Sequence, residues 1–291
     1  MSDAAVAQTG SLEEPIDAGE ELDLASKDEK FWRERAHDVN SRYRDEKNDL
    51  KSNTTTIGRY QSGDRFNVLY SNIQTICPAL YNQTPKADVR RRYRDADETG
   101  KTIADVLERA LSFTLDENDF DRYMKMAVKD CQITGRGVTR VKYEAAFGKD
   151  EQIQGIDGEG EYEVLEREEV EFEHVSWSDF RRGPGRTWEE IMWVAFKHTF
   201  DKDELEENFP KTAKDIPLDY SPEGMDGEDY EDINDTFKRA IVWEIWDKKK
   251  REVVFMCPGL SERPCKTVKD PLNLKDFWPI PRPMYAADYT D

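Results

Sequence analysis

The chain has 291 residues, of which 36% are charged and only 37% are apolar. Its 43 basic and 63 acidic residues give a net charge of −20 at pH 7. Such a surface repels nucleic acid over most of its area, because non-specific DNA affinity comes from Lys and Arg side chains that displace counterions. The length allows one large domain or two ordinary ones, and the apolar core must come from a few stretches.

Targeting and membrane signals are not recognisable in the sequence. No stretch approaches the roughly 18 consecutive apolar residues that a membrane-spanning helix needs. The N-terminal residues, MSDAAVAQTGSLEEPIDAGEELD, are acidic and lack the apolar core of a secretory signal. We expect residues 1–25 to form a disordered acidic tail.

The four cysteines point to a reducing environment. Cys77 and Cys131 lie in helical patterns and are expected to be reduced core residues. Cys257 and Cys265 share the loop CPGLSERPC, whose spacing permits a disulfide or half a metal site. No second CxxC and no nearby His completes such a site, so we favour reduced thiols in an intracellular setting.

Two helices are expected first. Residues 26–51 are strongly charged with a thin apolar stripe, which is typical of a solvated helix. Residues 66–82 form a helix with one apolar face, made by Phe66, Leu69, Ile73, Ile76, Cys77 and Leu80. Asp64 is its expected N-cap, Pro78 should kink it, and Pro85 should end it.

A short extended run at 87–89 then leads into a cluster of arginines, Arg90, Arg91, Arg92 and Arg94. Arginine binds phosphate and carboxylate equally well in a forked geometry. In a chain with a net charge of −20, pairing with acids of the same or a neighbouring subunit is favoured over DNA binding. We therefore take the four arginines as subunit-interface candidates.

The longest helical pattern covers residues 101–133, and the acids at 116–119 are expected to bend or split it. It should stop at Gly135-Arg136-Gly137, because glycine adopts the left-handed conformation that closes a helix. Together with the helix at 66–82, it is expected to form a buried scaffold.

Mostly antiparallel strands follow. Residues 138–145 and 161–175 are expected to pair as a hairpin, as are 238–248 and 251–256. A strand is expected at 193–200, and a short helix at 201–209 opens with a capping box formed by Asp201 and Glu204. Residues 176–187 and those after 256 are expected to be loops. Helices followed by antiparallel strands predict the α+β class.

Catalytic and ligand-binding patterns are weak. The acidic stretch 150–173 could hold Mg²⁺ or Ca²⁺, but it lacks EF-hand spacing, so a solvated face is favoured. The sequence has no P-loop, GxSxG or HExxH motif. His37, His174 and His198 are far apart, and a hydrogen-bonded structural role is expected for His198. We predict no cofactor, no metal and no enzymatic activity.

Four segments resemble tailed-bacteriophage portal proteins, most closely the podovirus-type branch. They occur in the family's order and cover about residues 30–280: FNVLYSNIQTICPALYNQTPKADV, AVKDCQITGRGVTRVKYEAAF, SWSDFRRGPGRTWEEIMWVAFKHTFDKDELEENFP and RAIVWEIWDKKKREVVFM. Each segment alone is a loose pattern, and their order is what makes the resemblance specific. The matching parts are those of the portal wing region.

The resemblance implies a homo-oligomeric ring, usually a dodecamer, at the head vertex of the virion. Double-stranded DNA would pass through its channel during packaging and ejection without sequence-specific contacts. Terminase, tail adaptor proteins and the major capsid protein would be its partners, and the ring would assemble in the host cytoplasm. On this basis residues 26–270 form a wing-like α+β region, and 271–291 form a loop leading toward a stem and clip. Family members are usually longer, so the chain is expected to be truncated.

Two other functions are considered beside this structural role. One is a metal-dependent phosphodiesterase that uses converging carboxylates. The other is a soluble, monomeric adaptor or scaffolding protein.

Overall fold

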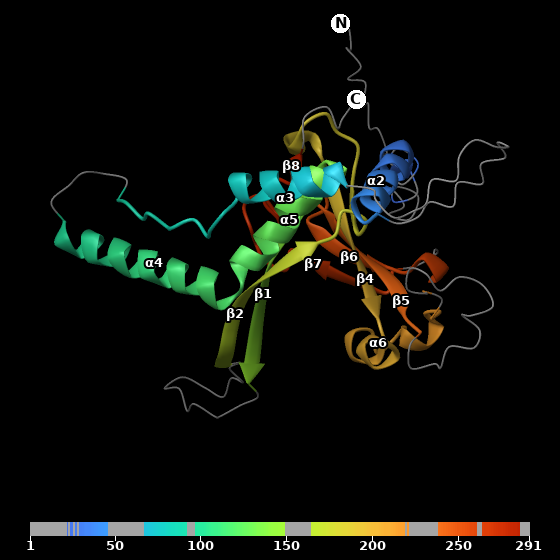
Figure 1. Ribbon diagram of the computed structural model, residues 1–291. Helices are drawn as coiled ribbons and strands as arrows, with labels where there is room; N and C mark the ends of the chain where they lie inside the picture. Colours follow the sequence, from blue (N-terminus) through green and yellow to red (C-terminus); the bar gives the residue numbers. More distant parts are fainter. Residues whose placement is uncertain are drawn as a thin grey trace, which may run out of the picture. The chain divides into compact units, whose positions relative to one another are not determined.

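The computed structural model in Figure 1 describes residues 22, 24–25, 27, 29–45, 67–91, 97–148, 164–218, 220, 238–260 and 264–285. The chain divides into two compact units. The sheet unit comprises Met1–Glu29 and Arg181–Pro271, and the helical unit comprises Lys30–Phe180 and Leu272–Asp291. Helices and antiparallel sheets confirm the predicted α+β class. The domain limits expected from the sequence, at residues 25 and 270, stay predictions.

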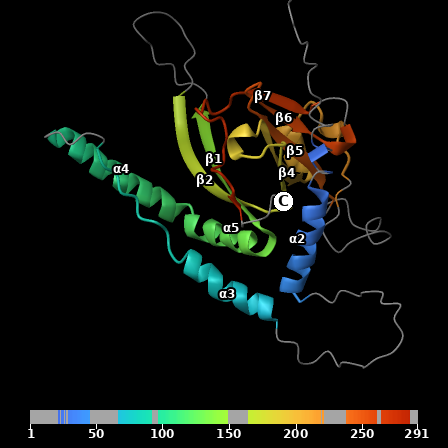
Figure 2. The same ribbon diagram turned by 90° about the horizontal axis from the view of Figure 1, so that it is seen from above.

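The helical unit contains four helices among its described residues, α2 (Lys30–Tyr43), α3 (Val68–Leu80), α4 (Glu98–Glu117) and α5 (Phe120–Thr134). Its sheet has the order β2-β1-β8, formed by β1 (Arg136–Gly148), β2 (Val164–Val175) and β8 (Met284–Tyr285). The predicted hairpin is confirmed, because β1 and β2 pair antiparallel from Val138–Val175 outward. α3 lies beside α5, and α4 projects away from this pair (Figures 1 and 2).

Helix α5 is the centre of the helical unit. On one side Ile133 joins a buried cluster with Tyr43 of α2 and Ile73 of α3. On the other side it packs on the hairpin, where the rings of Phe120 and Phe172 meet edge to face with centroids 5.0 Å apart. The left-handed Gly135 (φ 90°) ends α5, which confirms the predicted glycine stop.

A close approach of backbones fixes α5 against β1. A β-carbon added to Gly137 would lie 2.1 Å from the carbonyl oxygen of Ala127, and a backbone atom cannot rotate out of the way. Gly137→Ala is therefore expected to lower the free energy of unfolding by about 1–3 kcal/mol, through forced separation of α5 and β1. Urea denaturation measures this change. An unchanged midpoint would show that the two elements separate without cost.

The sheet unit contains a five-stranded antiparallel sheet in the order β3-β4-β5-β6-β7. Its strands are β3 (Phe180–Arg182, which begins at the boundary between the units), β4 (Trp193–Phe200), β5 (Ala240–Asp247), β6 (Glu252–Met256) and β7 (Lys266–Lys269). Strand β4 and the β5–β6 hairpin confirm the predictions for those segments. Helix α6 (Lys202–Asn208) has the predicted capping box, with Glu204 N donating to Asp201 at 2.8 Å.

Both faces of this sheet are covered, so its central strands are almost continuously apolar. One face carries a core cluster of Ala25, Trp193, Ala195, Trp243, Ile245 and Met256. The other carries a cluster of Leu205, Phe209, Ile216, Ala240, Val242 and Cys257. Short 3₁₀ helices at Trp188–Glu190, Ala213–Asp215 and Pro258–Leu260 complete the described part of this unit.

Several local predictions were wrong. The N-cap of α3 is Asn67, whose side chain accepts from Tyr70 N at 2.9 Å, and not Asp64. The helix ends at Leu80, five residues before Pro85, and Pro78 lies inside it, so the kink expected at Pro78 stays a prediction. β3 lies in a predicted loop, as do β7 and β8. Strands of two to four residues are too short to show the alternation of apolar and polar residues that identifies a strand in sequence. They form because they pair with strands that are distant in sequence.

The predicted helix at 101–133 is split, as the acids at 116–119 indicated. α4 ends at Glu117, and Asp119 adopts a left-handed conformation (φ 51°) before α5 begins. The expectation that this whole stretch is a buried scaffold was wrong for α4, since none of its residues is buried. Only α5 has that role. Among the described residues, no helix combines the length and hydropathy of a membrane span.

Candidate functional site

Arg90 and Arg91 lie in the segment that joins α3 to α4, at the end of its described part that follows α3. This segment is fastened to α4 by the backbone N–H of Val89, which donates to Glu108 Oε2 at 3.3 Å. Arg90 forms a two-pronged ion pair with Asp88, with N–O distances of 2.6 and 2.8 Å. Its side chain is still 82% exposed, so solvent weakens this pair. The pairing with Asp88 raises the pKa of Arg90 above its usual value.

Arg91 lies over the first turn of α4. A β-carbon on Gly100 would come within 2.8 Å of Arg91 Cδ, so the side chain rests on this glycine. Asp97 caps the same turn by accepting from Thr99 N and Gly100 N at 3.0 Å each. Arg92 and Arg94 lie outside the described residues. The structure therefore places two of the four predicted interface arginines beside α4.

Helix α4 presents an uncovered apolar surface next to these arginines. We call it the α4 stripe: Ile103, Val106, Leu107, Leu111 and Phe113, with exposed fractions between 49% and 66%. Pairs of them are three, four or seven residues apart (103 and 106, 103 and 107, 107 and 111, 106 and 113), which places the five on one side of the helix. An apolar side of this kind is normally the buried side of a helix.

Helix α3 is only partly covered. Its residues Leu69, Ile73 and Cys77 face the core cluster shared with α2 and α5. Val68, Tyr70, Ile76 and Leu80 are exposed but do not share one side of the helix, because Ile76 and Leu80 lie on the same side as Leu69 and Ile73, and the ring of Tyr70 lies 5.4 Å from that of Tyr43. The sequence pattern had assigned Ile76 and Leu80 to the buried face, so that part of the prediction was wrong.

A groove of about 380 Å³ lies between α3 and α5. Two lysines of α5, Lys125 and Lys129, are among the residues that line it. Cys77 opens onto it, and Cys131 is buried nearby on α5. Burial raises the pKa of both thiols, and the charge of Lys129 only partly opposes this for Cys77. The thiols therefore stay protonated at neutral pH, which makes them poor nucleophiles.

The most buried polar contacts of the helical unit surround Arg136. This side chain has no exposed surface, and its guanidinium stacks between Trp32 (4.0 Å to the ring centroid) and Phe180 (5.5 Å). Arg33 reinforces the same place by donating to the carbonyls of Ser178 and Phe180 at 3.2 and 2.7 Å. We call Trp32, Arg33, Arg136 and Phe180 the Arg136 joint. It ties α2 and the start of β1 to the loop after β2.

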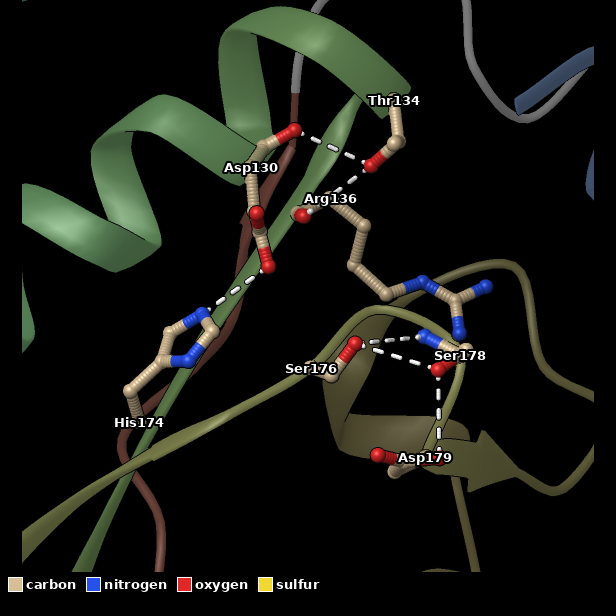
Figure 3. Close-up of polar contacts among 7 residues, drawn as sticks. All are labelled: Asp130, Thr134, Arg136, His174, Ser176, Ser178 and Asp179. Atoms are coloured by element: carbon tan, nitrogen blue, oxygen red, sulfur yellow. Dashed lines mark hydrogen bonds and ion pairs between the residues drawn. The ribbon is translucent and has the colours of Figure 1, made fainter. Parts of the chain in front are cut away.

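Polar side chains around this joint fix the neighbouring turn (Figure 3). His174 Nε2 and Asp130 Oδ2 are 2.9 Å apart, which links β2 to α5. Thr134 Oγ donates to the Asp130 carbonyl at 3.0 Å. Ser178 Oγ lies 3.1 Å from both Ser176 Oγ and Asp179 Oδ1. The His174–Asp130 contact joins two elements, and the others fix the end of α5 and the turn after β2, so the arrangement is that of a structural support.

A similar buried network lies in the sheet unit. Glu244 is 5% exposed, and its two carboxylate oxygens contact Trp246 Nε1 at 2.8 Å and His198 Nε2 at 2.7 Å. The ring of His198 also stacks on Phe200. The predicted structural, hydrogen-bonded role of His198 is confirmed. Elsewhere in the sheet unit, burial lowers the pKa of Arg181 to about 10, and the negative charge of Glu29 partly opposes this shift.

Sequence reasoning missed the Arg136 joint and the uncovered α4 stripe. Arg136 was seen only as part of a glycine turn, although an Arg flanked by two glycines at a helix stop was an available signal. Within the described ranges, no three His, Cys, Asp or Glu side chains gather as a metal site would require. Residues 150–163 of the acidic stretch lie outside those ranges. None of the four cysteines forms a disulfide.

Comparison with known proteins identifies the family of the chain. No curated protein matches it. The phage P22-like portal protein family matches residues 22–282, which is nearly the whole sequence and includes residues of both units. This range contains the segments whose order resembled the portal wing region. Proteins of this family have a structural role as ring subunits at the head vertex of the virion. The chain belongs to the phage P22-like portal protein family.

Proposed function

We propose that the chain forms a ring of twelve copies that serves as the conduit for DNA packaging and ejection. The observation that carries this proposal is the family match over residues 22–282. The net charge of −20 supports it, because an acidic channel wall repels the DNA backbone and lets the duplex slide. Its role is structural: identical subunits related by rotation pack side by side into a closed ring, and the chain catalyses no reaction.

The partners follow from the same role. We propose that the ring assembles in the host cytoplasm, contacts the major capsid protein, and then receives the terminase and later the tail adaptors. Family membership supports this sequence of contacts. Double-stranded DNA passes through without sequence-specific contact.

We further propose that Arg90, Arg91, Arg92 and Arg94 contact acidic side chains of the neighbouring subunit. This proposal is supported by the exposure of the Arg90–Asp88 ion pair. The side chain of Arg90 is 82% exposed and that of Asp88 is 60% exposed, so a carboxylate of a neighbouring subunit can reach the guanidinium. Arginine forks accept such shared pairing more readily than lysine.

Ring formation is tested by purifying the chain and examining it by electron microscopy and native mass spectrometry. We expect closed particles with a central hole and a mass near twelve times that of the subunit. A strict monomer at high concentration would contradict the proposal. Metal-dependent nuclease activity of the purified chain, lost on Asp150→Asn, would replace it with the phosphodiesterase function.

A further inference from the structure

Helix α4 lacks a partner for its apolar side among the described residues. It has 20 residues, and none of them is buried. The stability of an amphipathic helix in a protein comes mostly from packing of its apolar side. In α4 the five large side chains of the α4 stripe are instead 49–66% exposed. The stripe is one continuous surface, because its members share one side of a single helix.

Positive charge borders the first turn of this stripe. The side chain of Arg91 rests on Gly100, which is three residues before Ile103 and seven before Leu107 and so lies on the same side of α4. The segment that carries Arg91, KADVRR at residues 86–91, has three basic residues and one acidic residue. The α4 stripe therefore suits a surface that is apolar and has acidic side chains beside it.

The β1–β2 hairpin of the same unit has an apolar face that is only partly covered. Val141 lies opposite Phe172 in the register of the two strands. Tyr143 lies opposite Val170, two residues farther out and thus on the same face. The ring of Phe120, the first residue of α5, packs on Phe172. The cover ends there, since Val141 and Tyr143 are 37% and 43% exposed.

Acidic side chains border this exposed face of the hairpin. Strand β2 has the sequence VLEREEVEFEHV, with five glutamates and one arginine. Glu168 lies on the same face as Tyr143, whose hydroxyl donates to its carboxylate at 2.8 Å. The hairpin thus combines exposed apolar side chains with a surplus of negative charge, and it is complementary to the α4 stripe and its neighbouring arginines.

We propose that the α4 stripe of one copy packs on the exposed hairpin face of the next copy, with Arg90 and Arg91 close to the glutamates of β2. This inference rests on the proposed ring function and names its contact. A second copy is the occupant because the chain itself presents both complementary surfaces, and within one copy both stay exposed. Two different surfaces make a heterologous contact, which repeats in one rotational sense and can close into a ring.

The test uses two variants that each damage one surface. Leu107→Glu places a charge in the α4 stripe, and Tyr143→Glu places one on the hairpin face. Each variant alone is expected to associate about 100-fold more weakly, because a carboxylate would be buried against apolar side chains. Both side chains are exposed in the single chain, so circular dichroism and thermal unfolding should match the unaltered protein.

Two matched controls change charge on the other side of each element. Lys101→Glu lies on the side of α4 that faces away from the stripe, and Glu144→Ala lies on the opposite face of the hairpin from Tyr143. Both controls should form rings. Loss of rings in Lys101→Glu would overturn the proposal, because the side of α4 that carries the stripe would then not be what matters.

Mixing the two damaged variants is the decisive step. The intact α4 stripe of Tyr143→Glu can pack on the intact hairpin face of Leu107→Glu, so native mass spectrometry should show mixed dimers and no rings. Dimers of Tyr143→Glu alone would overturn the proposal, because they would mean that α4 pairs with α4. Rings that persist in both variants would also overturn it, while leaving the proposed function intact. An unaltered chain that never assembles would instead contradict the proposed function.

Discussion

Arg136→Ala is expected to lower the free energy of unfolding by about 3–5 kcal/mol, the range typical of truncating a large, fully buried side chain to alanine. The guanidinium has no exposed surface and stacks between Trp32 and Phe180. Its loss would leave a cavity beside two aromatic rings and would remove one of the two arginine donors at the carbonyl of Phe180. The Arg136 joint connects α2, β1 and the loop after β2, so these elements should loosen together.

Two further variants accompany Arg136→Ala: one tests whether the positive charge alone stabilises the joint, and the other is a control at an exposed arginine. Arg136→Lys keeps the charge but lacks the planar fork, so we expect it to recover only part of the lost stability. Arg122→Ala removes an exposed arginine from α5 and should change stability by less than about 0.5 kcal/mol. Urea denaturation followed by tryptophan fluorescence measures all three, since Trp32 lies in the joint. Equal midpoints for Arg136→Ala and Arg122→Ala would refute a structural role for the joint.

Glu244→Ala is expected to have an effect of similar size in the sheet unit, about 3–5 kcal/mol. The carboxylate is 5% exposed and contacts Trp246 Nε1 and His198 Nε2 through different oxygens. Alanine would leave the indole N–H and the imidazole without this partner. Leaving a buried polar group without a hydrogen bond destabilises the fold by more than a typical hydrogen bond stabilises it. The strands β4 and β5, which carry His198 and Glu244, would lose a direct side-chain link.

Glu244→Gln is the matched control for this prediction. The amide oxygen can still accept from Trp246, and the amide nitrogen can donate to an unprotonated ring nitrogen of His198. We therefore expect the Gln variant to lose less than half of what the Ala variant loses. Thermal unfolding of both proteins provides the comparison. If the two variants lose the same stability, hydrogen bonding by Glu244 is not what stabilises the sheet.

The sequence predicted local structure well wherever the signal lies in neighbouring residues. The glycine at 135 ends α5, and Asp201 and Glu204 form their capping box. The apolar residues of β4 and β5 gave the strand limits almost unchanged. These features depend on backbone geometry and on hydrogen bonds within a few residues, so a short segment contains all the information that determines them.

The α4 stripe shows where this reasoning fails. Periodicity identifies an apolar side of a helix, but it does not say which molecule covers that side. Residues 101–133 have one continuous pattern, yet α5 is covered by its own chain and α4 is not. The break at Asp119 separates two helices with different surroundings. An exposed stripe and a buried stripe have the same sequence signature.

The sequence by itself determined the α+β class, the order of most elements, and the resemblance that the family match over residues 22–282 confirms. Only the tertiary structure decided that Arg136 stacks on Trp32, more than one hundred positions earlier, and that two of the four arginines predicted to lie at an interface are beside α4. The physical reason is the range of the interactions. Helix caps, turns and strand periods are set by residues close in sequence, whereas burial is set by whichever distant segment, or neighbouring copy, covers a surface.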